Sequence, residues 1–216
     1  MAYYRGLELF TNLRYSDAIE AFDKALIYNI DRLINAKTHY WKAEALFKID
    51  KYAQAADVYK TFLITPGAFQ LDEYKTAHYN LGYAYFKTGT YLQAGNWFRK
   101  YVKMQEDSTL ERYSDALNRV GDLYFLQTLY SDAIKYYHQS VERNGLDADY
   151  ALYQKGFALG LINKPSEKIH VLSQLFTAYP QSTYIDDAVF ETAKSYEVMQ
   201  MNEKALTWYN KLITEH

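Results

Sequence analysis

The five histidines are the side chains best suited to bind a metal ion or to transfer a proton. They are His39, His78, His138, His170 and His216. No two of them have the spacing by which one helix presents two imidazoles to a zinc ion, and no HExxH motif occurs. His39 and His78 recur at one position of an internal repeat. A metal site or a proton relay would explain that recurrence, but a packed repeat residue explains it more simply.

Motifs for catalysis and nucleotide binding are also missing from the sequence. GxGxxG, GxxxxGK[ST] and GxSxG do not occur. The absence of cysteine excludes disulfides and thiolate metal sites. Adjacent acidic residues such as Asp186 and Asp187 point in different directions on a helix. The sequence therefore predicts a protein that has neither enzymatic activity nor a cofactor.

Aromatic side chains are the unusual component of the composition. They make up 18% of the 216 residues, and 24 of them are tyrosines. The 49% hydrophobic and 23% charged residues are typical of a folded globular chain. The net charge of −2 argues against a general nucleic-acid binder. No apolar run approaches the ~18 residues that cross a membrane.

An internal repeat must position these aromatic side chains. Six segments align on one marker residue each: Ala18, Ala55, Ala94, Ala133, Lys168 and Ala205. Twelve residues earlier stand Gly6, Ala43, Gly82, Gly121, Gly156 and Ala193. Apolar residues at spacings of three and four predict two amphipathic helices in each segment. The small residues at both positions should let the two helices approach closely, with Gly82 near Ala94 and Gly121 near Ala133.

Residues 80–94, NLGYAYFKTGTYLQA, carry the clearest copy of this pattern. They resemble a tetratricopeptide repeat, a helix–turn–helix unit of about 34 residues. The resemblance extends over almost the whole chain. It implies an all-α fold, a right-handed α–α superhelix (solenoid) of about six repeats. The expected repeats span residues 1–30, 36–66, 75–104, 114–144, 149–180 and 186–216.

Two repeats depart from the pattern. In the fifth, Pro165 is expected to open the second helix, and Lys168 replaces the marker alanine. We expect Lys168 to extend its amine outward to solvent, which would loosen the packing. In the sixth, Asn202 replaces a tyrosine. The linker at 179–188 resembles repeats of bacterial cell-envelope tetratricopeptide proteins of the BamD and YbgF type.

Neither end of the chain has the polar capping helix with which solenoids normally finish. Trp208, Tyr209 and Leu212 would then stay partly uncovered at the C-terminal end. We therefore expect one solenoid, spanning residues 1–216, that is a piece of a longer array. A complete small protein with a poorly capped end is the alternative.

The exposed side of the first helices is the predicted binding surface, because packing uses their other faces. Aromatic rings stand fifteen residues before the marker in five of the six repeats. The predicted concave, peptide-binding groove is lined by Tyr40, Tyr79, Tyr83, Tyr150, Tyr153, Phe157, Lys37 and Arg119. Tyrosine offers contact area at low entropic cost and a hydroxyl group for orientation. The alternative is that these rings pack against the neighbouring first helix. The series Phe10, Phe47, Phe86 and Phe125 is expected to pack between repeats.

We therefore expect a non-catalytic scaffold that binds a protein or peptide partner, as part of a bacterial envelope-associated protein. The alternative is a cytoplasmic regulatory module that senses a peptide or docks on an output domain. A helical-repeat RNA reader would need a basic groove, whereas Glu44, Asp115 and Asp122 lie on this one. The partner, the oligomeric state and the location stay open, with the periplasm favoured over the cytoplasm.

Overall fold

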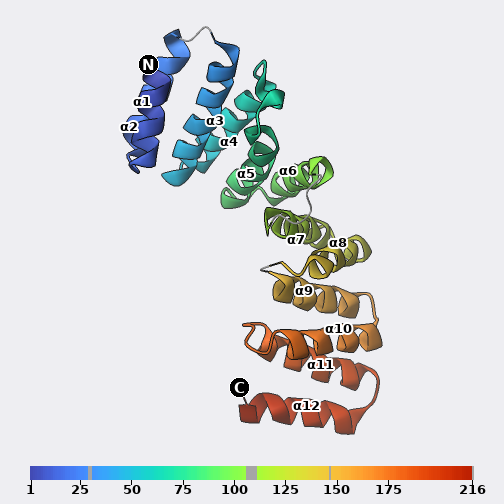
Figure 1. Cartoon of the computed structure of the whole chain (residues 1–216). Coiled ribbons are helices and arrows are strands. Elements are labelled where there is room, and N and C mark those ends of the chain that lie inside the picture. Colours follow the sequence, from blue (N-terminus) through green and yellow to red (C-terminus); the bar gives the residue numbers. More distant parts are fainter. Residues whose placement is uncertain (29–30, 106–110, 146, 216) are drawn as a thin grey trace. The chain divides into compact units, whose positions relative to one another are not determined.

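The computed structural model describes residues 1–28, 31–105, 111–145 and 147–215. These residues form twelve α-helices and one short 3-10 helix, and no strand occurs among them (Figure 1). The expected all-α helical-repeat fold is therefore confirmed. Residues 29–30 and 216, at the ends of the first and last expected repeats, lie outside the described part of the chain. None of the described helices has the length and apolar character that a bilayer crossing requires.

The chain divides into two compact units, Met1–Gln105 and Glu106–His216. Unit 1 contains α1 (Ala2–Thr11), α2 (Tyr15–Tyr28), α3 (Arg32–Lys48), α4 (Tyr52–Ile64), the 3-10 helix η1 (Ala68–Gln70), α5 (Glu73–Lys87) and α6 (Tyr91–Met104). Unit 2 contains α7 (Glu111–Leu126), α8 (Tyr130–Arg143), α9 (Ala148–Leu161), α10 (Pro165–Ala178), α11 (Ile185–Val198) and α12 (Asn202–Glu215). The first helix of each repeat is odd-numbered. Within each unit these odd-numbered helices contact one another and form what we call the first-helix face.

The missing side chain of the repeat glycines makes room for a ring from the second helix. A Cβ atom on Gly82 would lie 2.9 Å from the ring of Phe98, and one on Gly121 would lie 2.5 Å from the ring of Tyr137. The two glycines thus face the second helix of their own repeat, as expected. Their nearest partner is the aromatic residue four positions after the marker rather than the marker alanine itself.

All six turns inside the repeats have the same backbone geometry. The residue five positions before each marker has a positive φ: Leu13, Asp50, Gly89, Thr128, Asn163 and Gln200. The next residue donates its N–H to the carbonyl five positions earlier, as in Arg14 to Leu9 and Leu129 to Tyr124. This is the Schellman arrangement, which satisfies the last carbonyls of a helix with one left-handed residue. It ends α5 at Lys87.

Thr128 and Gly89 occupy this left-handed position with opposite conformational preferences. A β-branched residue with positive φ is strained, so Thr128→Gly should raise the free energy of unfolding by about 0.5–1 kcal/mol. Gly89→Ala should lower it by about 1 kcal/mol through backbone strain alone, because a Cβ there meets no atom within 4 Å. Urea denaturation followed by circular dichroism measures the free energy of unfolding of both variants. Equal midpoints for the two variants would contradict this interpretation of the turn.

A phenylalanine and a tyrosine close the same end of each of the first four repeats. Their rings meet edge to face at 5.0–5.3 Å: Phe10 with Tyr15, Phe47 with Tyr52, Phe86 with Tyr91 and Phe125 with Tyr130. The expectation that these phenylalanines pack between repeats is therefore incomplete. Each contacts a tyrosine of its own repeat, while Phe10 and Phe125 also reach Trp41 and Phe157 of the next repeat.

Candidate functional site

A hollow in unit 2 lies where the fifth repeat departs from the pattern. Gly160 and Pro165 take the places of the phenylalanine and tyrosine that close the earlier repeats, and Lys168 takes that of the marker alanine. All three line a hollow of about 210 Å³ between α9, α10 and α11. The remaining lining residues are Phe157, Leu161, Asn163, Glu191, Lys194, Ser195 and Val198. The residues that weaken the repeat consensus thus create the space.

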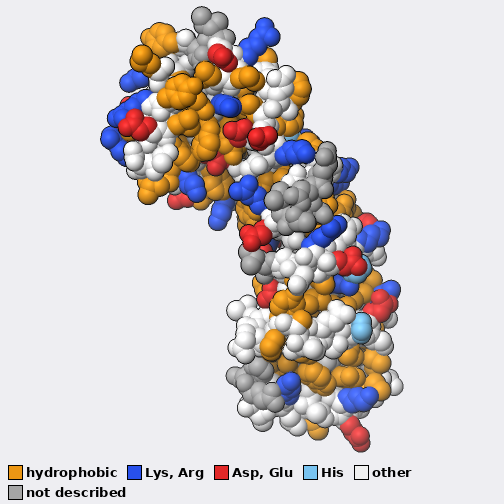
Figure 2. Space-filling view, in the orientation of Figure 1, with side chains coloured by type: hydrophobic (Ala, Val, Ile, Leu, Met, Phe, Trp, Pro, Cys, Tyr) orange, Lys and Arg blue, Asp and Glu red, His pale blue; other side chains and the backbone are white. Residues whose placement is uncertain are grey.

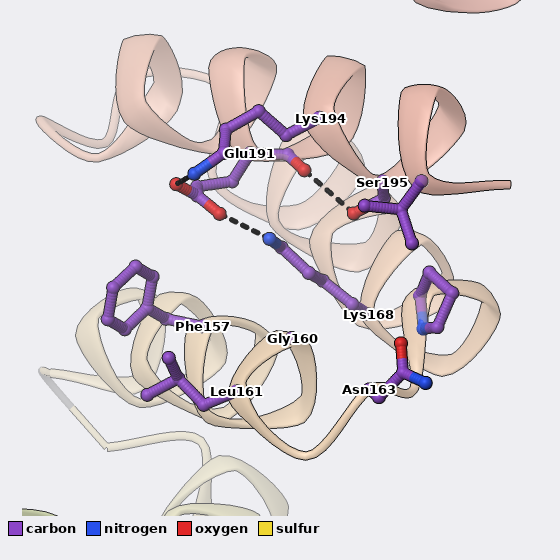
Figure 3. Close-up of a pocket in the computed structure, with 10 residues that line it drawn as sticks. Phe157, Gly160, Leu161, Asn163, Lys168, Glu191, Lys194 and Ser195 are labelled. Atoms are coloured by element: carbon purple, nitrogen blue, oxygen red, sulfur yellow. Dashed lines mark hydrogen bonds and ion pairs between the residues drawn. The ribbon is translucent and has the colours of Figure 1, made fainter. Parts of the chain in front are cut away.

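Lys168 corrects an expectation drawn from the sequence, because its amine does not extend to solvent. The residue is only 5% exposed, and its Nζ donates to Glu191 Oε2 across the α10–α11 boundary (Figure 3). A Cβ atom on Gly160 would lie 3.0 Å from that Nζ. The absence of a side chain at Gly160 therefore gives the buried lysine its room. Pro165 begins α10 as expected, since proline suits a first helical position.

Glu191 is the centre of the polar part of the hollow. It is 7% exposed, and its second oxygen, Oε1, lies 3.5 Å from Lys194 Nζ on the same helix. A buried carboxylate is tolerated only when it is paired, because desolvation of a charge is costly. Two lysines on one glutamate meet that requirement.

The other walls of the hollow are mainly apolar and open, although Asn163 and Ser195 also line it. Phe157 and Leu161 project from α9 on the side opposite Glu191 (Figure 3), and Val198 from α11 adds a further apolar side chain. Leu161 is 47% exposed and Val198 is 63% exposed. Such surface gains free energy when an apolar group of a partner covers it. The hollow can therefore hold an apolar side chain beside a fixed set of charges.

A row of aromatic rings continues from the hollow across the first-helix face of unit 2. Tyr184, Tyr153, Phe157 and Phe125 follow one another with centroids 5.2, 6.2 and 6.0 Å apart and interplanar angles of 13°, 23° and 30°. We call these four rings the aromatic row. They are half-buried, so part of each ring stays accessible. Burial, with Asp187 and Glu191 nearby, raises the pKa of Tyr153 to about 12, which keeps its hydroxyl group protonated.

Tyr150 and Arg119 belong to a polar cluster beside the aromatic row. Asp122 Oδ1 accepts hydrogen bonds from the hydroxyls of Tyr137 at 2.9 Å and Tyr150 at 2.6 Å. Asp122 Oδ2 accepts from Arg119 Nη1 at 2.6 Å, and Arg119 also pairs with Asp115 at 3.3 Å. Burial raises the pKa of Asp122, although Arg119 opposes that shift. Asp122 thus connects α7 to α8 and α9 through the two tyrosine hydroxyls, whereas the ion pairs of Arg119 lie within α7.

Unit 1 contains a related cluster around Glu44. Tyr59 and Asn80 both donate to Glu44 Oε1, and burial raises the pKa of Tyr59 well above its usual value. Tyr59 and Tyr137 both stand four positions after their markers, and Glu44 and Asp122 both stand eleven before. In these two repeats a tyrosine at the first position accompanies an acid at the second, whereas in the sixth repeat Tyr209 accompanies Lys194 and donates its hydroxyl to Glu197 instead. Glu44 and Asp122 stabilise buried hydroxyls, whereas the sequence suggested open charges in a groove.

The predicted site residues of unit 1 divide between core and surface. Tyr40 is only 6% exposed and packs against Tyr59 and Phe62, so the structure places it in the core rather than on a groove. Tyr79 and Tyr83 are half-buried with centroids 5.1 Å apart. Their rings meet Phe98 of α6 at 5.6 and 5.0 Å, so they pack on their own second helix. Lys37 lies half-buried on α3.

Comparison with protein families identifies this helical pattern. A family model described as tetratricopeptide repeat matches residues 3–72 and 51–111, which together cover half of the chain. The chain belongs to the tetratricopeptide repeat (TPR) family. A search of curated proteins finds no match.

Solved TPR structures share the fold of this chain. YrrB, described as a TPR protein with an unusual peptide-binding site, is 23% identical, with a TM-score of 0.68 over 90% of this chain and 92% of its own. The C-terminal part of a TPR repeat-containing protein from Cytophaga hutchinsonii is 18% identical, with a TM-score of 0.72 over 98% and 78%. A MamA structure is 17% identical, with a TM-score of 0.69 over 82% and 90%. At these identities the likeness establishes the TPR fold alone.

Most residues of this TPR site were not among those predicted from the sequence; Phe157 is the one predicted site residue that lines the hollow, and Glu191, Leu161, Val198 and Tyr184 were missed. Glu191 could have been found, because a lysine at a buried marker position requires an acidic partner. Tyr184 precedes α11 in the linker between repeats, where no repeat position predicts its direction. Of the predicted residues, the structure brings Tyr150, Tyr153, Phe157 and Arg119 together in unit 2.

Proposed function

We propose that this TPR protein is a non-catalytic scaffold that binds a polypeptide segment of a partner on the first-helix face of unit 2. The observation that carries the proposal is the apolar-walled hollow beside the aromatic row. Phe157 belongs to both, so a bound segment would contact one continuous surface. A side chain in the hollow would act as the anchor, and the aromatic row would support the neighbouring residues.

The size and surroundings of the hollow favour a polypeptide over other ligands. Its volume of about 210 Å³ suits one or two side chains rather than a cofactor, since small-molecule sites are typically ~300–1,000 Å³. Acidic and basic side chains are interspersed with hydrophobic ones on the face drawn in Figure 2. A nucleic-acid partner would favour a continuous basic field instead.

The half-buried Tyr79, Tyr83 and Lys37 provide a second, smaller contact surface on unit 1 in this proposal. We place the protein in the bacterial cell envelope, on the resemblance of the 179–188 linker to envelope TPR proteins. A cytoplasmic sensor that docks on an output domain is the second candidate. Fractionation of the source cells, followed by detection of the chain with an antibody, distinguishes the two locations.

Selection from a phage-displayed random peptide library tests the binding function on the intact chain. Enriched peptides should bind the wild-type protein and lose about tenfold or more in affinity to a Leu161→Ser/Val198→Ser variant. Both residues are exposed, so their replacement should leave the circular dichroism spectrum unchanged. Leu206→Ser on α12, at 61% exposure, is the matched control outside the hollow. Failure to enrich any peptide, or equal binding by all variants, would refute the proposal.

A further inference from the structure

The end of the aromatic row farthest from the hollow is surrounded by carboxylates. Asp147 and Asp149 stand at the start of α9, the helix of Tyr153, and Asp187 stands in the first turn of α11, which begins directly after Tyr184. Their negative charges add to burial in raising the pKa values of Tyr153 and Tyr184. Asp149 accepts hydrogen bonds from the Ser182 hydroxyl at 2.6 Å and from the backbone N–H of Tyr150 at 2.8 Å, both neutral donors. Within the described residues, none of these three carboxylates forms an ion pair.

Three cations near the aromatic row, Arg119, Lys168 and Lys194, are already engaged. Arg119 is held by Asp115 and Asp122, and Lys168 is buried against Glu191. Lys194 contacts Glu191 at 3.5 Å and lies 5.4 Å from the centre of the Phe190 ring. Lys168 and Lys194 share the single charge of Glu191, so one positive charge is left over, but three carboxylates, Asp147, Asp149 and Asp187, outnumber it. The net charge around Tyr153 and Tyr184 is therefore negative. Aromatic rings with nearby carboxylates are complementary to a guanidinium or ammonium group, which is attracted to both.

We infer that the bound segment is basic: it places an arginine or lysine between Asp187 and the rings of Tyr153 and Tyr184, and an apolar side chain in the hollow. This inference rests on the proposed function and specifies its partner. Arginine fits better than lysine, because its planar guanidinium group can stack on a ring while it donates to a carboxylate.

The spacing of the two subsites restricts the sequence of the segment. Tyr153 and Leu161 are eight residues apart on α9, which corresponds to ~12 Å along the helix. An extended chain covers ~3.3–3.6 Å per residue. The arginine and the apolar residue should therefore be three or four positions apart in an extended segment.

A defined set of fluorescein-labelled peptides tests this inference on the full chain by fluorescence anisotropy. Each peptide is a serine–glycine chain with one leucine and one arginine four positions apart, made in both orders. Matched peptides replace arginine by the neutral isostere citrulline or by glutamate. In the preferred order, the arginine peptide should bind about fivefold more tightly than the citrulline peptide and much more tightly than the glutamate peptide. The affinity advantage of the arginine peptide over the citrulline peptide should become smaller at about 0.5 M salt, because screening weakens exposed charge pairs.

Two variants test whether Asp187 is responsible for the preference for arginine: Asp187→Asn and the control Glu203→Gln. Asp187→Asn should lower the arginine-to-citrulline affinity ratio while the citrulline peptide binds as before. Glu203→Gln removes an exposed acid on α12, outside this face, and should leave the ratio unchanged. Equal binding of arginine and citrulline peptides would overturn the inference and leave the proposed function standing. If both variants lose the preference for arginine, that preference comes from the net charge of the protein, and the inference is also overturned. If no peptide of the set binds, both this inference and the proposed peptide-binding function are refuted.

Discussion

Replacement of Glu191 by alanine should lower the free energy of unfolding by about 3–5 kcal/mol, the cost of leaving a buried charge without its partner. Lys168 lies in the interior, and the pair it forms with Glu191 connects α10 to α11. Lys194 is half exposed and can be hydrated after the change, whereas Lys168 is buried and would lose its only described carboxylate partner. Urea denaturation followed by circular dichroism measures the loss, and hydrogen exchange should show it in α10 and α11.

Lys168→Met/Glu191→Leu is the control for this prediction. Buried ion pairs can often be exchanged for apolar residues of similar volume at little cost or with a gain in stability. The double variant should therefore be much more stable than Glu191→Ala. If the single change costs less than about 1 kcal/mol, the two side chains are hydrated in solution and the hollow is wider than described.

Gly121→Leu should lower the free energy of unfolding by about 1–3 kcal/mol, because it overpacks the contact between α7 and α8. The Cβ atom alone would come within 2.5 Å of the Tyr137 ring. That ring cannot turn away easily, because its hydroxyl is hydrogen-bonded to Asp122. Gln139→Leu, at an exposed position of α8, adds the same side chain without this contact and should be close to neutral. A thermal melt that is the same for both variants would show that the pairing of the helices is wrong.

The repeat spacing predicted the helices and their pairing well, because each repeat must solve the same local problems. A small residue is needed where two helices approach, as at Gly82 and Gly121. A left-handed residue is needed to end each first helix, and Leu13, Asp50 and Gln200 show that this need not be glycine. The first requirement is visible in the sequence as a glycine or alanine at one repeat position, whereas the second leaves no single residue type by which the sequence could show it.

The candidate site was predicted only in part, because its geometry depends on which side chains meet across repeats. Tyr40 and Tyr79 occupy the same repeat position, yet Tyr40 is buried against Phe62, while Tyr79 stays half exposed. Lys168 illustrates a different limit. Its direction depends on Gly160 one helix earlier and on Glu191 one helix later, and only the folded arrangement connects the three.

The Schellman turn has the same register in all six repeats, whereas the hollow depends on three residues of the fifth. This separation makes the array modular: the backbone that connects helices is independent of the side chains that shape a cavity. A cavity could then be erased by restoring Phe, Tyr and Ala at Gly160, Pro165 and Lys168. It could also be grafted elsewhere by carrying Gly, Pro and Lys, with a glutamate on the following helix, into another repeat. In such an array the position of a binding site can shift by whole repeats while the scaffold stays the same.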